Sequence, residues 1–196
     1  MKIRDSGMPD ESYWESLFDV PLILSRLEIA RFHDVGELGC GYGTFSVPVA
    51  KAISGTLHTF DVDLAMLDRT RERGAGLRII CEQRDVMELG FGVNVDAVLL
   101  FNILHCDRPI ELLRHAANAV QPDGQVLVIH WRYGETPRGP SLEIRPRPEQ
   151  IIQWASEADL EPFGEVVDLP PWHYGLRFTR TVNRPHLPPP PRGDTR

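Results

Sequence analysis

Three glycines alternate along the segment VGELGCGYG, at positions 39, 41 and 43. The segment follows a short apolar run and precedes a helix-like stretch, so it joins a predicted strand to a predicted helix. Glycine lets the backbone approach a ligand closely, and the first amides of a helix attract polar or anionic groups. Gly39, Gly41 and Gly43 therefore predict a ligand-binding turn, although a tight turn without a ligand has the same pattern.

Carboxylates follow the next two predicted strands. Asp61 ends one strand with Asp63 beside it, and Asp85 ends the strand after that. A carboxylate at the end of the second strand can accept both hydroxyls of an adenosine ribose. We expect this role for Asp61, with a solvated strand-end acid as the alternative, and we expect Asp85 to lie near an adenine amino group.

Two classes of cofactor fit a glycine turn that is followed by an acid. A dinucleotide carries a pyrophosphate and favours the spacing Gly-x-Gly-x-x-Gly. This chain has Gly-x-Gly-x-Gly instead, preceded by Glu37. A carboxylate there would repel a pyrophosphate but suits a cation such as the ammonium group of S-adenosylmethionine. The charges therefore favour S-adenosylmethionine.

Two histidines stand at the ends of the fourth and fifth predicted strands, His105 in NILH and His130 in HWR. Ligands of open α/β sheets bind outside the carboxyl ends of the strands. A histidine in that place can act as a general base when a nucleophile must lose a proton. We predict both as catalytic residues, and a structural histidine is the alternative at each position.

Aromatic and basic side chains flank these strand ends. The predicted substrate contacts are Tyr13, Trp14, Trp131 and Arg132. Aromatic residues in a leading helix are also common in cores. Three further arginines are candidates for recognising a substrate carboxylate or phosphate, or belong to an exposed basic loop: Arg138, Arg145 and Arg147. The run Trp172-His173-Tyr174 fits either a pocket wall or hairpin packing.

No metal site is expected, because Asp107 near the fourth strand end has no companion carboxylates. Cys40, Cys81 and Cys106 cannot all pair, and their spacings fit no zinc motif. We expect reduced, mostly buried thiols in a cytoplasmic protein. Cys40 is interpreted as a small residue beside the ligand rather than as a reactive thiol.

The elements that position these residues alternate between strand and helix patterns. The expected strands are 34–38, 56–62, 78–84, 95–101 and 125–131, and the expected helices are 45–53, 64–73 and 109–120. The nearly continuous apolar run 95–101 is typical of a central parallel strand that is covered on both faces. This alternation predicts an α/β fold with a parallel sheet.

The flanking segments are less regular. Residues 11–30 predict a helix interrupted at Pro21, 134–148 a loop, 149–160 a helix, and 166–169 with 176–182 a closing hairpin. We expect one domain over residues 1–183, comprising a helical cap (1–33), a cofactor-binding core (34–131) and a substrate-side region (132–183). The proline-rich residues 184–196 predict a disordered tail.

Composition limits the partners. The 196 residues suit one domain, and the net charge of −7 argues against a nucleic-acid partner, whose phosphates require clustered Lys and Arg. No apolar run approaches the roughly 18 residues of a membrane span. The charged N-terminus, broken by Gly7 and Pro9, is unlike a signal peptide. We expect neither nucleic acid nor membrane as a partner, and the sequence does not predict the oligomeric state.

The motifs together resemble a class I S-adenosylmethionine-dependent methyltransferase of the small-molecule type. Residues 37–43 (ELGCGYG) resemble the family's first motif, 60–63 (FDVD) with Met66 its second, and 84–86 (RDV) its adenine-side motif. Residues 96–105 (DAVLLFNILH) resemble the strand whose end lines the methyl-transfer site. Residues 120–125 (VQPDGQ) resemble the turn before the fifth strand, where Asp123 replaces one of two usual glycines. The resemblance covers about residues 34–131.

This resemblance implies a Rossmann-like, doubly wound, mostly parallel sheet of seven strands with an antiparallel C-terminal hairpin. It implies S-adenosylmethionine as the cofactor and a small molecule as the methyl acceptor, with His105 facing the methyl group. The alternatives are a non-catalytic S-adenosylmethionine-binding module and a nicotinamide-dependent oxidoreductase. The implied cofactor-binding residues are Glu37, Gly39, Cys40, Gly41, Tyr42, Gly43, Asp61, Val62, Met66, Asp85, Val86, Phe101 and Asn102.

Overall fold

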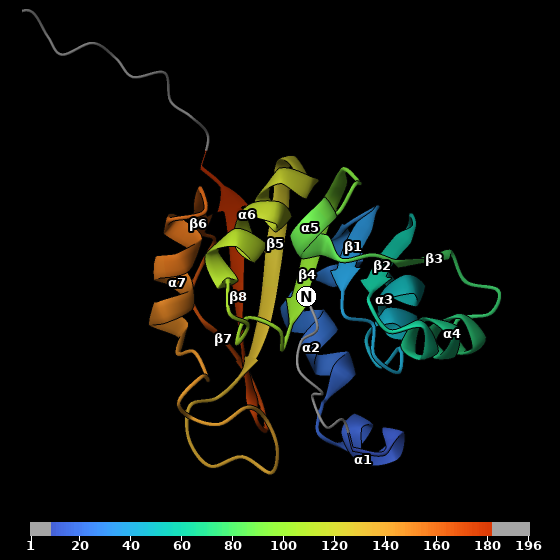
Figure 1. Ribbon diagram of the computed structural model, residues 1–196, viewed down its shortest axis with the longest axis horizontal. Helices are drawn as coiled ribbons and strands as arrows, with labels where there is room; N and C mark the ends of the chain where they lie inside the picture. The colour runs from blue at the N-terminus through green and yellow to red at the C-terminus, as the bar shows by residue number, and fades with distance from the viewer. Residues whose placement is uncertain (1–8, 182–196) are drawn as a thin grey trace, which may run out of the picture.

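A computed structural model describes residues 9–181, in which strands and helices alternate along most of the chain (Figure 1). The strands are β1 (Val35–Leu38), β2 (Leu57–Asp61), β3 (Ile79–Gln83), β4 (Val95–Phe101), β5 (Val120–Trp131), β6 (Leu160–Pro162), β7 (Val167–Leu169) and β8 (His173–Arg180). The helices are α1 (Glu11–Ser16), α2 (Val20–Arg26), the 3-10 turn η1 (Ile29–Arg31), α3 (Ser46–Ala52), α4 (Leu64–Arg73), α5 (Val86–Leu89), α6 (Pro109–Ala119) and α7 (Pro148–Ser156).

The strands form one mixed sheet in the order β3-β2-β1-β4-β5-β8-β6, and β7 pairs with β8 beside this path. Strands β1 to β5 are parallel, whereas β8 runs antiparallel to β5, β6 and β7. The chain moves outward from β1 to β3 and then returns to β4 on the other side of β1. The strand order therefore reverses between β1 and β4, and α/β sheets bind ligands at such a point.

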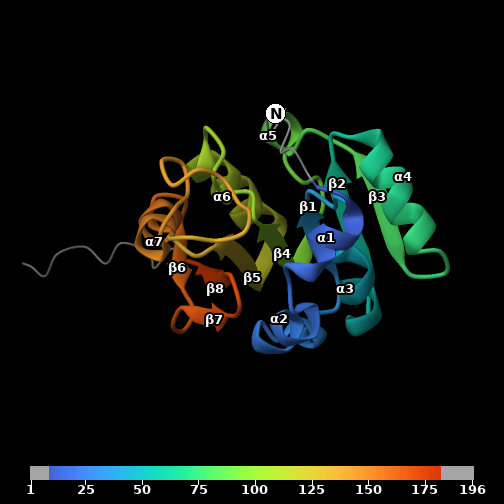
Figure 2. The same cartoon turned by 90° about the horizontal axis from the view of Figure 1, so that it is seen from below.

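Helices cover both faces of the sheet, which confirms the doubly wound arrangement. On one face, Val98 and Leu100 of β4 pack with Leu112 of α6 and Ile151 of α7. On the other, Ala97 and Leu99 pack with buried residues of α2 and α3. Figure 2 shows α6 and α7 on one side of the strands and α2 and α3 on the other. Because β4 is covered twice, its apolar run is nearly continuous.

Strand β5 contains the turn that the sequence predicts at residues 122–124. Val95 pairs with Val120 and Ala97 pairs with Gln125, so two steps along β4 match five along β5. The extra residues bulge out of the ladder, and regular pairing resumes at Gln125. The predicted strand 125–131 is thus the regular part of a longer strand.

The N-terminal segment differs from the expectation of a break at Pro21. The break between α1 and α2 lies at residues 17–19, and Pro21 occupies the first turn of α2. Proline is tolerated there because its missing amide has no helical partner. The Asp19 carboxylate caps the helix by accepting from the Leu22 amide at 3.1 Å.

The C-terminal hairpin is confirmed, with Leu169 of β7 opposite His173 of β8. Two details of the expectation are wrong. The expected helix 149–160 instead runs from Pro148 to Ser156. Leu160 begins the short strand β6, so the sheet in the described residues has eight strands and not seven. Strand β8 also begins three residues earlier than predicted. The predicted tail, 184–196, lies outside the described residues.

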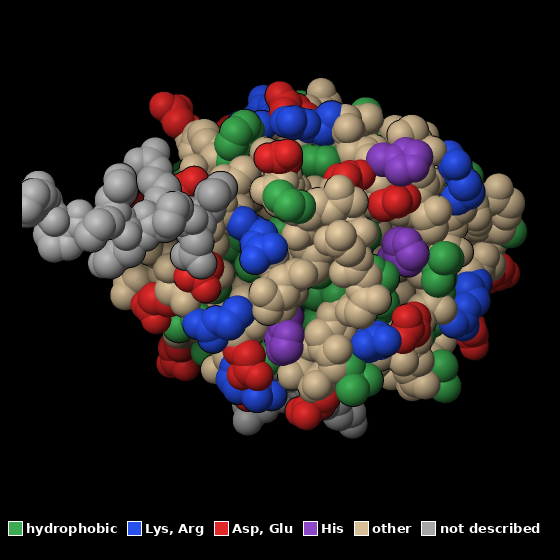
Figure 3. Space-filling model, turned by 90° about the horizontal axis from the view of Figure 1, so that it is seen from above, with side chains coloured by type: hydrophobic (Ala, Val, Ile, Leu, Met, Phe, Trp, Pro, Cys, Tyr) green, Lys and Arg blue, Asp and Glu red, His purple; other side chains and the backbone are tan. Residues whose placement is uncertain are grey.

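No helix in residues 9–181 is long and apolar enough to cross a membrane. Acidic and basic side chains are interspersed over the face seen from above, opposite the view of Figure 2 (Figure 3).

Candidate functional site

The three glycines of the loop after β1 all adopt left-handed backbone conformations. Their φ angles are 80° at Gly39, 52° at Gly41 and 78° at Gly43. An L-residue with a side chain pays about 1–2 kcal/mol in this region. A Cβ at Gly43 would also lie 3.1 Å from Oγ1 of Thr70 in α4. The loop geometry therefore requires glycine, as the sequence pattern predicts.

Asp61 faces this loop from the end of β2. Its Oδ2 accepts from the Gly41 amide at 3.4 Å and from the Cys40 thiol at 3.6 Å, and its Oδ1 accepts from the Asp63 amide at 3.0 Å. Asp63 has a different task, because its carboxylate caps α4 by accepting from the Ala65 amide at 2.9 Å. Of the two neighbouring acids, Asp61 is the one aimed at the glycine loop.

A narrow cleft opens beside this loop. Its lining brings together five of the predicted cofactor residues, with Ile103 behind them: Gly39, Asp61, Val62, Asp85 and Val86. The Asp85 carboxylate also caps α5, accepting from the Met87 amide at 3.0 Å. Val62 is 40% exposed at the rim, whereas Val86 is buried. Met66 lies in the first turns of α4, half-buried and outside this lining.

Glu37 lies beneath the loop and not on the surface of the cleft. Its side chain is 2% exposed, and its Oε2 accepts from the Ser46 hydroxyl at 2.5 Å. Burial raises the pKa of Glu37 to about 7, and the nearby Asp61 carboxylate adds to the rise. A bound cation would lower this pKa again, so a positively charged ligand suits the position electrostatically.

Cys40 and Tyr42 have local roles in the loop. Burial raises the pKa of the Cys40 thiol far above its usual range, and the Asp61 carboxylate raises it further. The thiol therefore stays protonated, which agrees with the expectation of an unreactive residue. The Tyr42 hydroxyl donates to the Pro9 carbonyl at 2.9 Å and holds the N-terminal segment near the loop.

Helix α1 is fixed over the loop by ion pairs with α4. Arg73 contacts Glu11 at 3.0 Å and Glu15 at 2.7 Å, and it also donates to the Tyr42 carbonyl at 2.8 Å. Of the two predicted substrate residues in α1, Tyr13 is 40% exposed. Trp14 instead packs edge-on against Phe18 at 5.0 Å and belongs to the core periphery.

Strained and unpaired groups mark the end of β4. Asn102 has a φ of 55°, which is unusual for a residue other than glycine. Among the described residues, nothing pairs with its buried amide nitrogen and oxygen. Phe101 before it packs edge-on against Phe45 at 5.0 Å. Backbone strain and unpaired polar atoms concentrate at functional sites because both carry a free-energy cost.

The two predicted catalytic histidines come together at the ends of β4 and β5. The ring centroids of His105 and His130 are 5.5 Å apart. Within residues 9–181, neither ring nitrogen of His130 nor Nδ1 of His105 has a hydrogen-bond partner. Burial lowers the pKa of both, to about 3 for His130. Both imidazoles are therefore neutral near pH 7, and the low pKa of His130 makes it a weak proton acceptor.

Trp131 points to the opposite face of β5 from His130, because successive residues of a strand alternate. It is 2% exposed and packs against His173 at 4.2 Å and Phe18 at 6.0 Å. This is a core position, so the structure does not support Trp131 as a substrate contact. Arg132 is held by an ion pair with Asp168 and by a bond to the His173 carbonyl.

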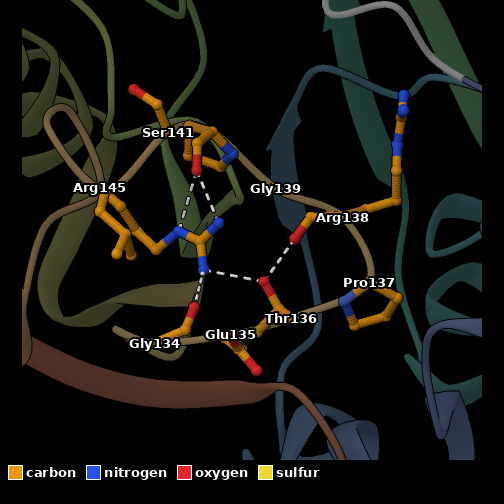
Figure 4. A pocket seen from close by; sticks show the side chains of 10 residues that line it. Gly134, Glu135, Thr136, Pro137, Arg138, Gly139, Ser141 and Arg145 are labelled. Carbon is orange, nitrogen blue, oxygen red and sulfur yellow. Dashed lines mark hydrogen bonds between the residues drawn. The ribbon is translucent and has the colours of Figure 1, made fainter.

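Arg145 organises the loop that follows β5, whereas the sequence named it only as one of three candidate arginines, with Arg138 and Arg147. Its guanidinium donates to the carbonyls of Gly134 and Pro140 and to the Thr136 hydroxyl (Figure 4). The loop lines an open surface hollow of about 440 Å³. The one signal in the sequence is a local excess of arginine, which did not distinguish Arg145 from Arg138 or from Arg147. Arg147 stacks on Tyr133 at 3.6 Å.

In the described part of the chain, no group of three or more His, Cys, Asp or Glu side chains is arranged to hold a metal ion. The candidate site is therefore built from the glycine loop, the strand-end acids and the histidine pair.

A known protein family resembles the chain in sequence, and solved structures resemble it in fold. Residues 35–124 match the family model of the methyltransferase domain, a stretch that contains the glycine loop, Asp61 and Asp85. No curated protein sequence is significantly similar to the chain.

Several solved structures share the fold. A SAM-dependent methyltransferase from Aquifex aeolicus has a TM-score of 0.74 and 21% identity, over 88% of this chain and 94% of that chain. A putative type 11 methyltransferase from Sulfolobus solfataricus has a TM-score of 0.72 and 22% identity, over 87% and 97%.

A third structure is an O-methyltransferase from neocarzinostatin biosynthesis, in complex with S-adenosyl-L-homocysteine and 1,4-dihydroxy-2-naphthoic acid. It has a TM-score of 0.70 and 17% identity over 81% of this chain, which spans about half of that protein, 52% of its length. The glycine loop and the strand-end acids thus lie within a match to the methyltransferase domain, residues 35–124, and the chain shares its fold with S-adenosylmethionine-dependent methyltransferases.

Proposed function

We propose that this chain is a methyltransferase and acts on a small molecule bound at the carboxyl ends of β4 and β5. The observation that carries the proposal is the meeting of two groups at the point where the strand order reverses. The left-handed glycine loop and the Asp61 carboxylate lie on one side of this point, and the paired His105 and His130 lie on the other. A cofactor bound by the first group would present its reactive end toward the second.

The residues present fit S-adenosylmethionine. The glycine loop leaves room for a ligand against the backbone, and Asp61 can accept the ribose hydroxyls. Asp85 and Val86 line the same cleft and would border the adenine, with Val62 at its rim. Glu37 beneath the loop would favour the methionine ammonium through its charge. The unpaired amide of Asn102 is placed to bond the cofactor or the acceptor.

When bound, S-adenosylmethionine supplies an electrophilic methyl group on a sulfonium centre. The chain's task is then to hold the acceptor atom in line and to remove its proton where it carries one. His105 is our candidate for this proton, because burial keeps its imidazole neutral. His130 packs edge-on against His105, with ring centroids 5.5 Å apart, and would hold the His105 ring in place.

The acceptor is a small molecule, as it is in the O-methyltransferase complex with 1,4-dihydroxy-2-naphthoic acid. We propose the same division of the domain that the sequence suggests, in which the cap (1–33) and the substrate-side region (132–183) would flank the cofactor-binding core. The protein is cytoplasmic, which agrees with three cysteines that are all free.

Methyl transfer separates an enzyme from a module that only binds the cofactor. The assay follows S-adenosylhomocysteine production across a panel of hydroxylated and aminated small molecules, with the parent and His105→Ala. We expect turnover with at least one acceptor, and we expect His105→Ala to bind S-adenosylhomocysteine as the parent does but to lose about 100-fold or more in rate. Equal rates for the two proteins would refute the role of His105. Cofactor binding without turnover across the panel would support the binding module.

A further inference from the structure

The substrate-side loop contains a buried positive charge that no acid neutralises. Arg145 is 7% exposed, and its hydrogen bonds go to carbonyl oxygens and one hydroxyl. Among residues 9–181, no carboxylate oxygen lies within the 4.0 Å that defines an ion pair with it. Carbonyl groups satisfy its N–H donors but leave its charge in place, and a buried charge without a counter-ion is costly.

Unpaired polar atoms lie close to this charge. Within residues 9–181, the fully buried His130 has no hydrogen-bond partner at either ring nitrogen, and His105 has none at its buried Nδ1. Tyr174 connects them to the loop, since its hydroxyl donates to the Pro146 carbonyl at 2.9 Å and its ring lies 6.3 Å from that of His130. Arg145 is close enough to help lower the pKa of both histidines, after the effect of burial.

The loop also has room for a ligand. Arg145 lines its open hollow of about 440 Å³, which is large enough for one end of a small molecule. Apolar side chains stand exposed on the same loop, with Tyr133 at 41%, Leu142 at 44% and Ile144 at 54%. Residues 132–147 contain four arginines and two glutamates, so this stretch has a local charge of +2 in a chain whose net charge is −7.

We propose that the acceptor is an acid with an apolar body, and that its carboxylate or similar anionic group compensates the buried charge of Arg145. This inference rests on the proposed function and names its substrate class. The anionic group would lie against the 134–145 loop, and the methyl-accepting group would lie at His105 and His130. The exposed apolar side chains of the loop would cover the body of the acceptor.

The test compares acids with neutral molecules of the same shape. 4-Hydroxybenzoate and 1-hydroxy-2-naphthoate are each paired with their methyl esters, and binding is measured by calorimetry with S-adenosylhomocysteine present. The parent should bind at least one acid about tenfold or more tighter than its ester, as expected for a charge-assisted contact. Arg145→Gln should abolish this ratio, and Arg145→Lys should retain part of it. Arg147→Gln, which removes an exposed charge from the same loop, should keep the ratio.

The ratio of the affinities for acid and ester distinguishes recognition of the charge from damage to the loop, because a disordered loop would weaken the binding of acid and ester alike. Equal affinity of the parent for acids and esters would overturn the proposal. Binding of neither at millimolar concentration, with normal S-adenosylhomocysteine binding, would overturn it as well. Absence of S-adenosylhomocysteine binding would instead refute the proposed function from which the inference starts.

Discussion

Replacement of Glu37 by glutamine should stabilise the protein at alkaline pH while weakening its affinity for the cofactor. Glu37 is 2% exposed, and its carboxyl accepts from the Ser46 hydroxyl at 2.5 Å. Glutamine has nearly the same shape and retains an oxygen for that hydrogen bond. The substitution therefore removes the titrating charge with little change in packing.

The magnitude follows from the pKa of Glu37. Burial raises this pKa from an ordinary value of 4.5 to about 7 in the folded state. Between these values the folded state binds more protons than the unfolded chain, so its stability falls as pH rises. The contribution of Glu37 protonation to the free energy of unfolding is fully present below pH 4.5 and is lost above about pH 7. The total change is about 3 kcal/mol. Glu37→Gln should abolish this loss.

Urea unfolding at a series of pH values from 5 to 8 measures this effect as the difference between variant and parent. The difference should be small near pH 5 and should grow to about 3 kcal/mol in favour of the variant near pH 8. The exposed Glu165→Gln controls for loss of one negative charge. A difference that stays constant across this range would show that Glu37 does not titrate as its burial requires.

Cofactor affinity is the second part of the same prediction. If Glu37 serves cofactor binding at a cost in stability, Glu37→Gln should be more stable than the parent but should bind S-adenosylmethionine more weakly. Unchanged affinity of Glu37→Gln for S-adenosylmethionine would remove Glu37 from the cofactor site, even if the stability result holds.

Two other substitutions test the loop and the core. Gly43→Ala places a side chain in the left-handed region and 3.1 Å from Oγ1 of Thr70. We expect urea unfolding to show a destabilisation of about 2 kcal/mol, and we expect weaker binding of S-adenosylhomocysteine. An unchanged unfolding midpoint would contradict the requirement for glycine in the loop. Trp131→Ala should lower the free energy of unfolding by about 3–5 kcal/mol, because the side chain is buried against Phe18 and His173. If Trp131→Ala is little destabilised but loses acceptor binding, Trp131 would be a substrate contact and not a core residue.

The centre of the parallel sheet was predictable from the sequence because its central strands, such as β4, are covered on both faces. The expected strand 95–101 has the same bounds as β4, and the expected helix 64–73 has the same bounds as α4. Helix α5 was missed, since its four residues are too few to show a helical period. Its signal was present in the capping carboxylate of Asp85, which the sequence argument assigned to a ligand alone.

The far end of the sheet was less predictable. Strand β6 has only three residues and lies at the edge of the sheet. Proline is tolerated at an edge, but in a sequence Pro162 argues against a strand, so β6 was not predicted. Pairing with β5 and β7 extends β8 to His173, and a local pattern cannot reveal such long-range pairing.

Site residues that depend on loop and strand-end motifs were predicted more completely than those that depend on tertiary packing. The positions of Gly39 after β1 and Asp61 at the end of β2 were predictable because spacing along the chain determines where strand ends lie. Trp131 and His130 were both assigned to the site, although the alternation of β5 places them on opposite faces. Arg145 was not distinguished from its neighbours, because a loop without periodicity gives no indication of which arginine turns inward.

Calorimetry of the purified protein with S-adenosylmethionine and S-adenosylhomocysteine, with NADH as a control, tests the central claim most directly. Asp61→Ala is measured beside Asp63→Asn, since Asp63 caps α4 and does not face the glycine loop. We expect the parent and Asp63→Asn to bind both adenosyl ligands with micromolar affinity and not to bind NADH. Asp61→Ala should lose at least about tenfold in affinity, as removal of a charged hydrogen-bond acceptor implies. Binding of NADH, or of neither adenosyl ligand, would contradict the assignment of this site to S-adenosylmethionine.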